Sequence, residues 1–441
     1  MKKPRSSFFA TPSDQPAQKG ATAGVAPQGK HTPAERNDPH QTIDAHALAT
    51  PPAEARSIEK LAAHLAAAAN AEREKARAIF RWIAANITYG MGNKGTGNGP
   101  PEEVLRMRFG YCGGIAGLFE ALARAMGLEV VTIPGHAKGR GYTPGTPLRG
   151  VPDHAWNAVR IDGQWELIDA TWGGGFYVGE EYRKRFEPHY FCTPPQQFIH
   201  DHFPVDPQWQ LLKIPKNEAA FIFPPLLKPD FFRAGLALGG HPEGVIHCPA
   251  FLSLGLVRPD EVLLHGELWA RNQALNPALV FIQHAPGTVT FQVRLPRPGV
   301  YSFRIFARPG AQEGGFPWAM EYRLETRVGF HGKPHFPKQY ADYAGRGAVL
   351  ETPIEGSLSC RQPHRFRITV PGAREVALIQ GERWEHLELL PPEPPPMGLP
   401  QAKPPPPGFQ GDIQPPRGQS FLAASFEEGG KFHTLLEYTG F

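Results

Sequence analysis

The sequence predicts an α+β domain followed by two all-β sandwiches in a chain of 441 residues. Three observations support this fold class. Apolar residues recur at the helical period between residues 58 and 126, and short strands with a hairpin signal follow from residue 129. From about residue 220 the chain becomes a series of short alternating strands broken by Pro and Gly. The length suits two or three domains of roughly 150 residues each.

Residues 1–52 precede the first periodic segment and are rich in Ala, Pro, Gln, Thr and Gly. They cannot bury enough surface to offset the entropy of ordering, so we expect a disordered arm. The arm begins with basic residues but has only Phe8, Phe9 and Ala10 where a signal peptide needs a longer apolar core. We therefore expect a cytoplasmic protein with no Sec signal and no membrane span, and we leave export by another route open.

The α+β domain is expected over residues 53–213, with its helices first. Ile58, Leu61 and Leu65 fit one helix face, and a second apolar stripe covers residues 76–87. A third helix follows Cys112 and ends near Gly127, which suits a C-terminal cap. Strands are then expected at residues 129–133, 154–161 and 164–169.

The two sandwiches are expected over residues 214–330 and 331–441. Their strands are predicted at residues 262–269, 289–295, 301–307, 365–370, 376–380, 387–389 and 432–438. Residues 391–417 contain 12 prolines among 27 residues, a composition that favours an extended, solvated segment. We interpret it as an insertion inside the last domain.

Charge and cysteine usage exclude several classes of protein. The net charge is +4, from 46 Lys and Arg against 42 Asp and Glu, and the charges are scattered. This bias is too weak to indicate a nucleic-acid partner or an anionic membrane. The four cysteines lie far apart without a CxxC pair, so their spacing indicates neither a zinc site nor a disulfide framework. We expect three buried thiols and one reactive thiol.

Cys112 is the candidate reactive thiol. It lies at or just before the start of the third helix and is flanked by Gly110, Gly113 and Gly114. Unpaired N–H groups and the positive end of the helix dipole can stabilise a thiolate there, and the same N–H groups could hold an oxyanion. The alternative is a small buried cysteine beside a tight turn.

A predicted hairpin places a histidine near a carboxylate. The Asp-Gly pair at residues 162–163 favours a two-residue type I′ turn, because both central positions need a positive φ. This register puts Trp156 opposite Asp169 and His154 opposite Thr171, so His154 and Asp169 are diagonal neighbours roughly 7 to 8 Å apart. The carboxylate could then orient the imidazole. A bulged turn would break this register, and a surface His beside a strand-end Asp remains the alternative.

Several segments resemble a known family. The segments GYCGGIAGLF, DHAWNAVRIDGQWELIDATWG and AIFRWIAANITYG resemble the transglutaminase-like superfamily, whose members use Cys, His and Asp in that chain order. Residues 190–191, 198–204 and 206–212 are similar to the segment that closes this domain in kyphoscoliosis-type peptidases. Members of that group also have C-terminal immunoglobulin-like domains. The resemblance covers about residues 58–441 and excludes the N-terminal arm and the proline-rich insertion.

The resemblance implies a papain-like transglutaminase core followed by two immunoglobulin-like sandwiches. It implies Cys112 as nucleophile, His154 as general base and Asp169 as the residue that orients His154, with no metal and no organic cofactor. The expected function is a thiol-dependent peptidase or amide acyl-transferase acting on protein or peptide substrates. The sandwiches would bind the substrate or a partner protein.

Two alternatives stay open: a protein-crosslinking transglutaminase, and a catalytically silent scaffold or binding protein that retains the fold. The triad does not distinguish hydrolysis, transglutamination and deamidation, because all three pass through one acyl-enzyme.

Three other features are given structural interpretations. His200, Asp201 and His202 could suggest a metal, but adjacent side chains point in different directions on any regular element, so His202 is assigned to the closing segment. Trp82 fits the periodicity of the second helix and is expected in the core. Residues 135–152 are rich in Gly and Pro and are expected to form a loop that covers the cleft.

Overall fold

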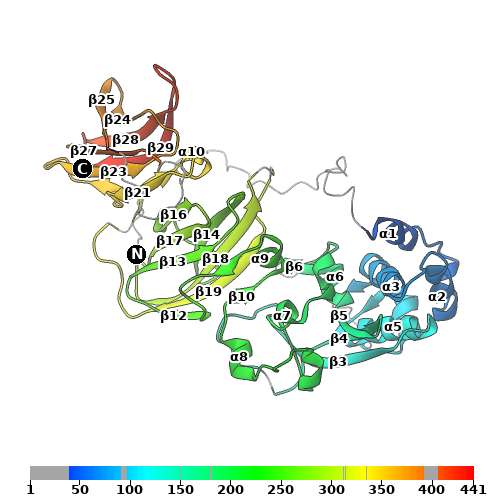
Figure 1. Cartoon of the computed structure of the whole chain (residues 1–441). Helices are drawn as coiled ribbons and strands as arrows, with labels where there is room; N and C mark the ends of the chain where they lie inside the picture. Colours follow the sequence, from blue (N-terminus) through cyan, green and yellow to red (C-terminus); the bar gives the residue numbers. More distant parts are fainter. Residues whose placement is uncertain are drawn as a thin grey trace, which may run out of the picture. The chain divides into compact units, whose positions relative to one another are not determined.

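The structure is a computed structural model that describes residues 39–90, 97–148, 150–178, 181–310, 312, 314–333, 335–391 and 406–441. Residues 1–38 of the predicted arm and residues 392–405 of the predicted insertion lie outside this described part. The described residues form three hydrophobic cores, one in an α+β domain and one in each of two β-sandwiches. Figure 1 shows the helices and strands of these domains. The predicted fold class is therefore confirmed, whereas the domain boundaries at residues 213 and 330 stay predictions.

A helix lies inside the segment predicted to be disordered. Helix α1 (Gln41–Leu48) buries Ile43 and Ala47 against the α+β core. Asp44 of α1 accepts hydrogen bonds of 2.7 and 2.8 Å from the guanidinium of Arg77. The prediction of a disordered arm is wrong for these residues. Two apolar residues four positions apart are too few to show periodicity, and tertiary packing stabilises this short helix.

The predicted helices of the α+β domain are confirmed. The helices that build this domain are α2 (Ile58–Ala66), α3 (Glu72–Asn86), α4 (Pro101–Met107), α5 (Cys112–Ala125), α6 (Ala170–Gly174) and α7 (Pro195–Phe198). Helix α5 starts at Cys112, and Gly127 just beyond its end has a φ of 78°, the left-handed value expected of a C-terminal glycine.

A five-stranded antiparallel sheet in the order β8-β5-β4-β3-β9 lies beside α3 and α5 (Figure 1). Its strands are β3 (Val130–Ala137), β4 (His154–Ile161), β5 (Gln164–Ile168), β8 (Phe191–Thr193) and β9 (His202–Pro204). Asn157 pairs with Ile168, which is the predicted register, and Asp162 and Gly163 both have a positive φ. The predicted pairings of Trp156 with Asp169 and of His154 with Thr171 do not form, because the chain leaves the sheet after Ile168 and enters α6.

Further short helices and strands lie between and within the domains. They are β1 (Thr88–Tyr89), β2 (Phe109–Gly110), β6 (Gly175–Val178), β7 (Glu181–Lys184), α8 (Glu218–Ile222), α9 (Pro229–Arg233), α10 (Ala341–Gly345) and the 3-10 helices η2 (Glu54–Arg56), η3 (Pro188–Tyr190), η4 (Pro207–Gln210) and η5 (Pro277–Leu279). Among the described residues, no helix is both long and apolar enough to span a membrane.

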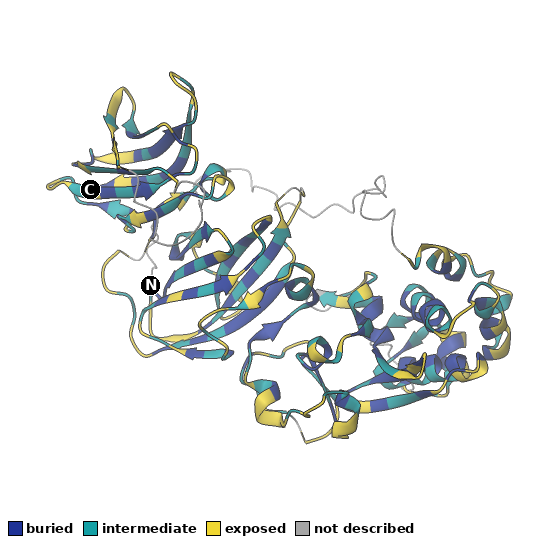
Figure 2. Cartoon of the chain, in the orientation of Figure 1, coloured by how far each residue is buried: buried dark blue, intermediate teal, exposed yellow. Residues whose placement is uncertain are grey.

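The first sandwich packs two sheets around an apolar core. One sheet has the order β10-β19-β18-β14-β15 with β12 parallel to β19, and the other has the order β11-β13-β17-β16. The strands are β10 (Leu226–Leu227), β11 (Ala237–Leu238), β12 (Val245–His247), β13 (Phe251–Val257), β14 (Val262–Ala270), β15 (Gln273–Ala274), β16 (Val280–Ala285), β17 (Thr288–Arg294), β18 (Gly299–Pro309) and β19 (Trp318–Thr326). Burial alternates along β14, as period-2 side chains on a half-buried strand require (Figure 2).

The second sandwich repeats this topology. One sheet has the order β20-β29-β28-β24-β25 with β22 parallel to β29, and the other has the order β21-β23-β27-β26. The strands are β20 (Lys338–Gln339), β21 (Val349–Thr352), β22 (Ser357–Leu358), β23 (His364–Thr369), β24 (Glu375–Gln380), β25 (Arg383–His386), β26 (Glu388–Leu389), β27 (Gly408–Ile413), β28 (Gly418–Ser425) and β29 (Phe432–Gly440).

Strand β27 corrects the predicted insertion. It lies within residues 391–417, pairs with β23 and β26, and buries Phe409 and Ile413 in the second core. The prediction that residues 391–417 are extended and solvated is therefore wrong for residues 408–413. The prediction failed because it used the proline content of the whole segment, although residues 408–413 contain no proline and have an apolar residue near each end.

Candidate active site

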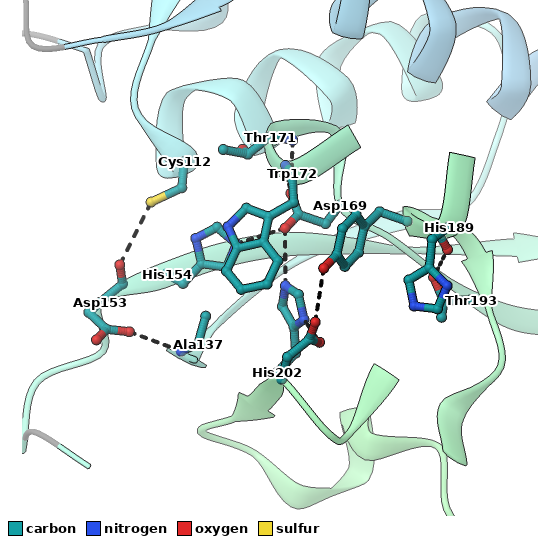
Figure 3. A network of polar contacts seen from close by, with 12 residues as sticks. Cys112, Ala137, Asp153, His154, Asp169, Thr171, Trp172, His189, Thr193 and His202 are labelled. Atoms are coloured by element: carbon teal, nitrogen blue, oxygen red, sulfur yellow. Dashed lines mark hydrogen bonds and ion pairs between the residues drawn. The ribbon is translucent and has the colours of Figure 1, made fainter. Parts of the chain in front are cut away.

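Cys112 is the first residue of α5 (Figure 3), and the loop that contains Gly97 and Asn98 holds this helix end in place. The N–H of Tyr111 donates to the carbonyl of Gly97 at 2.6 Å, and the N–H of Gly114 donates to Oδ1 of Asn98 at 3.2 Å. A Cβ atom on Gly114 would lie 2.2 Å from the Gly97 oxygen, so only glycine permits this close approach. The loop therefore fixes the backbone on both sides of the half-buried thiol.

The pKa of the Cys112 thiol is lowered. Burial raises it, but the hydrogen bond and charge of His154 and the N–H of Gly113 stabilise the thiolate and outweigh burial. Burial instead raises the pKa of Cys192 to about 12 and also raises that of Cys248. Cys192 also has a partner that favours its thiolate, Arg73, but there burial outweighs the partner, whereas at Cys112 the partners outweigh burial.

The structure brings His154 and Asp169 together, as the hairpin register predicts. Nε2 of His154 lies 2.8 Å from Oδ2 of Asp169, which leaves Nδ1 for the thiol of Cys112. The exposed fractions of His154 and Asp169 are 8% and 0%. Burial lowers the pKa of His154, but the charge of Asp169 and the hydrogen bond to it outweigh this effect and raise the pKa to about 10. The imidazole is therefore held as a cation.

Asp169 also caps helix α6. Its Oδ1 accepts hydrogen bonds from the N–H groups of Thr171 and Trp172 at 2.8 and 3.1 Å (Figure 3). Burial raises the pKa of Asp169, but the charge of His154 and the hydrogen bonds from both histidines hold it well below its usual range. The cap fixes one carboxylate oxygen and leaves the other for the histidines.

His202 was missed as a site residue. Its Nε2 lies 3.0 Å from Oδ2 of Asp169, and its Nδ1 lies 2.6 Å from Oδ1 of Asp201. The hydroxyl of Tyr190 donates to Oδ2 of Asp201 at 2.9 Å. The expectation that adjacent side chains point in different directions was made against a metal at residues 200–202, and it did not anticipate this contact, which forms because the chain turns at Asp201 as it enters β9. No spacing rule identifies His202, and only its place in the resembling closing segment was a signal.

His200 does not belong to this cluster. Burial lowers its pKa to about 4, and its Nδ1 is buried without a hydrogen-bond partner among the described residues.

The loop before β4 forms one wall beside the thiol. Strand β3 occupies the first part of the predicted covering loop, and the rest ends at Asp153, whose carbonyl oxygen lies 4.0 Å from Sγ of Cys112. Asp153 is held in place because its N–H donates to Gly135 and its Oδ1 accepts from the N–H of Ala137 at 3.1 Å. The wall is thus anchored to the end of strand β3 (Figure 3).

Aromatic rings enclose both histidines. The ring of His154 lies 5.3 Å from that of Trp172. The ring of His202 stacks on Phe198 at 4.0 Å and lies 5.0 Å from Trp156. Trp82 is not among these rings, because it is buried in the core on α3, as its periodicity predicted.

The donor atoms of His154, Asp169 and His202 lie within 4.8 Å of one another, close enough to be considered for a metal. However, one carboxylate oxygen lies between the two rings at 2.8 and 3.0 Å, the distances of N–H···O hydrogen bonds. We therefore assign a hydrogen-bonded chain and no ion, and the absence of a metal from the working protein stays a prediction.

Family models match two parts of the chain. Residues 59–170 match the transglutaminase-like superfamily, and residues 219–337 match the KY-like, immunoglobulin-like domain. All three predicted site residues lie within the first match.

Two curated proteins and one solved structure illustrate what this chain is similar to. The human kyphoscoliosis peptidase is 38% identical over 191 residues, which are 42% of this chain and 29% of that protein. Hillarin of Drosophila melanogaster is 28% identical over 221 residues, 47% of this chain and 27% of that protein. A solved structure of a putative cysteine protease from Cytophaga hutchinsonii is 25% identical and covers 32% of this chain and 45% of that one, with a TM-score of 0.22.

The chain spans less than a third of the length of these two curated relatives. The two family models match the chain in the same order as its domains, the α+β domain first and the β-sandwich second. The chain therefore joins a transglutaminase-like core to a KY-like, immunoglobulin-like domain and is a homologue of the kyphoscoliosis peptidases.

Proposed function

We propose that the chain is a thiol-dependent peptidase or amide acyl-transferase that acts on protein or peptide substrates through Cys112, His154 and Asp169. The observation that supports this proposal most directly is the buried pair of His154 and Asp169 at 2.8 Å beside a thiol whose pKa is lowered. The names of the kyphoscoliosis peptidases and of the putative cysteine protease point in the same direction.

The reaction would begin when the thiolate of Cys112 attacks the carbonyl carbon of an amide. The negative oxygen that forms would be held by the N–H of Cys112, for which no acceptor is found among the described residues. His154 would then give its proton to the leaving amine, and a thioester to Cys112 would remain. Asp169 would keep the imidazole in the orientation and tautomer that this transfer needs.

The second half of the reaction decides between hydrolysis and transfer. Water attacking the thioester would release an acid, whereas a primary amine would give a new amide. We favour water, because the relatives with the higher identity are named peptidases. The test is to incubate the full chain with a glutamine-containing protein and a labelled primary amine. Fragments are expected, and amine incorporation without cleavage would make the protein a crosslinking transglutaminase.

The rival proposal is a scaffold that retains the fold without the chemistry. Iodoacetamide distinguishes the two, because a working site should alkylate Cys112 faster than the other three cysteines. Equal rates would favour the scaffold. The sequence-based expectations of a cytoplasmic location, of no cofactor, of no nucleic-acid partner and of sandwiches that bind the substrate stay predictions.

The decisive variant is Cys112→Ala. It should abolish cleavage or acyl transfer and leave the melting temperature nearly unchanged, because it removes the nucleophile and only one half-buried sulfur atom. Cys192→Ala is the matched control, since it removes a sulfur whose pKa is raised and should keep activity. Activity that survives in Cys112→Ala would refute the catalytic proposal.

A further inference from the structure

Two histidines share one carboxylate oxygen at the candidate site. Oδ2 of Asp169 lies 2.8 Å from Nε2 of His154 and 3.0 Å from Nε2 of His202. The second nitrogen of His202, Nδ1, lies 2.6 Å from Oδ1 of Asp201. Each nitrogen of His202 thus faces a carboxylate, and a carboxylate only accepts hydrogen bonds. Both nitrogens must then carry protons, so His202 is an imidazolium.

No water is needed to complete this arrangement. The exposed fraction of His202 is 0%, and Asp169, Asp201 and Tyr190 are buried as well. The second oxygen of Asp201 accepts from the hydroxyl of Tyr190 at 2.9 Å. Burial raises the pKa of Asp201, but the charge of His202 and the hydrogen bonds outweigh it and lower the pKa. Asp201 is therefore the ionised partner that keeps His202 charged.

The charges alternate along the chain of contacts. Asp201 is negative, His202 positive, Asp169 negative and His154 positive, and the thiolate of Cys112 would complete the series. Charges in a low-dielectric interior interact strongly, so a change in one alters the proton affinity of its neighbours. The ring centroids of His154 and His202 are only 5.3 Å apart, within the range of such effects.

We propose that His202 is a positioning residue of this site: held as an imidazolium between Asp169 and Asp201, it fixes the carboxylate that orients His154 and offsets part of its negative charge. The inference rests on the proposed function of the triad. Without His202, Asp169 would hold the proton of His154 more tightly and give it up less readily to a leaving amine. Asp169 thus keeps the imidazole of His154 charged, and His202 lowers the pKa of that imidazole enough for its proton to pass to the leaving amine.

Ionisable groups reach His202 and Asp201 from the surrounding elements. They are His154 on β4, Asp169 before α6, His189 and Tyr190 on η3, His200 and Asp201 before β9, Lys138 after β3 and Lys228 before α9. Burial lowers the pKa of Lys138 to about 7, so this lysine titrates within the range of interest. The charge of Asp201 raises the pKa of this lysine, so Asp201→Asn also lowers the pKa of Lys138, whereas His202→Gln keeps Asp201 and leaves that interaction in place.

The variant Asp201→Asn separates charge from geometry. Its amide can donate to Nδ1 of His202, which then becomes neutral while Nε2–H still donates to Asp169. The Asp201→Asn variant loses the negative charge of Asp201 and the positive charge of His202. Asp201 lies on the far side of His202 from His154, so the loss of the nearer, positive charge has the larger effect on His154. Loss of a nearby positive charge raises the pKa of both His154 and Cys112. The acidic limb of Cys112 alkylation should therefore move to higher pH by about one unit.

The experiment measures the rate of Cys112 alkylation by iodoacetamide from acid to alkaline pH in the full chain. Asp201→Asn and His202→Gln should both shift the limb to higher pH. The matched control is His284→Gln, which replaces an equally buried histidine of the first sandwich and should leave the limb in place. A structural role alone would reduce stability without moving the limb. An unshifted limb in a folded Asp201→Asn variant would overturn the inference.

Two further measurements separate the inference from the function on which it rests. If the limb is absent in the wild type or unaffected by His154→Ala, the ion pair fails and both proposals fall. If His154→Ala removes the limb but Asp201→Asn leaves it unshifted, only the role of His202 falls. Nitrogen NMR of the His202 ring, assigned by its loss in His202→Gln, should show two N–H groups in the wild type and one in Asp201→Asn. A singly protonated ring in the wild type would also overturn the inference.

Discussion

His154 in the transglutaminase-like core and His284 in the first sandwich are both buried, with exposed fractions of 8% and 3%, yet they take opposite charge states. His154 faces Asp169, and its pKa is raised to about 10 because the carboxylate outweighs burial. Nε2 of His284 accepts the N–H of Leu264 at 3.1 Å. Burial lowers the pKa of His284 to about 4, and the charge of Arg258 acts in the same direction.

Burial alone would make both rings neutral, so the partner decides the charge. In the core, the partner is a carboxylate, and the result is a charged imidazole beside a thiol. In the sandwich, the partner is a backbone N–H, and the ring on β16 accepts from β14 of the facing sheet. The two regions should therefore respond differently to loss of a partner and to pH.

The largest effect is expected when the partner of His154 is changed. Asp169→Asn should lower amide cleavage on the order of 10⁴-fold, the loss seen when the orienting carboxylate of a triad becomes an amide. Without the carboxylate, burial should lower the pKa of His154, as it does for His284. The measurement is the cleavage rate of a peptide substrate together with the pH profile of Cys112 alkylation.

The matched control for this substitution is Asp162→Asn in the neighbouring turn. Asp162 is exposed and has a φ of 50°, a conformation that Asn tolerates well. The Asp162→Asn variant should keep full activity. If the two variants behave alike, Asp169 does not set the charge of His154.

A smaller effect, on the free energy of unfolding, is expected from His284 when the pH of the solution falls. Its pKa is about 4 in the folded chain, against an ordinary value of 6.5. Above pH 6.5 the ring of His284 is neutral in both the folded and the unfolded chain, so its titration does not change the free energy of unfolding. Below pH 6.5 the unfolded chain binds a proton that the folded chain does not bind. Stability should then fall by about 2 kcal/mol between about pH 7 and pH 5.

Urea unfolding of the full chain measures this loss, and His284→Gln serves as the comparison. The variant cannot take up the proton, so the difference in the free energy of unfolding between wild type and variant should shrink as pH falls. A difference that stays constant with pH would mean that His284 is not held neutral.

The smallest effect is expected far from both histidines. Deletion of residues 392–405 should change the free energy of unfolding by about 1 kcal/mol or less, because loop length alters closure entropy only weakly. β26 and β27 are in register on either side of the deletion, with Leu389 opposite Phe409. The melting temperature and the Cys112 alkylation rate check this.

Deletion of residues 408–413 is the contrasting variant, because it removes β27 from the second core and should unfold that sandwich. If both deletions cost equally, residues 392–405 do contribute to the packed structure.

Local signals in the sequence predicted much of the site. The Asp-Gly turn at residues 162–163 set the register that brings His154 near Asp169, and the helical stripe after Cys112 placed the thiol at a helix start. Each of these inferences depends on neighbours within about one hairpin or one helix. The resemblance then added the link between Cys112 and the hairpin, which local patterns cannot supply.

Contacts that join distant segments were missed. His202 meets Asp169 because β9 pairs with β3 at the edge of the sheet, and no periodicity records that pairing. Helix α1 and strand β27 were missed for a related reason. Each is short, and its apolar residues gain stability only from partners distant in the sequence.

The double role of Asp169 has one further consequence. The carboxylate that orients His154 also accepts the N–H groups of Thr171 and Trp172, so fraying of the first turn of α6 would remove two of the hydrogen bonds that hold this carboxylate in place. Local opening of that turn should then loosen the residue that orients the histidine. The deuterium uptake of these two amides measures how often the turn opens, so a purely structural measurement would follow the rigidity of the orienting carboxylate.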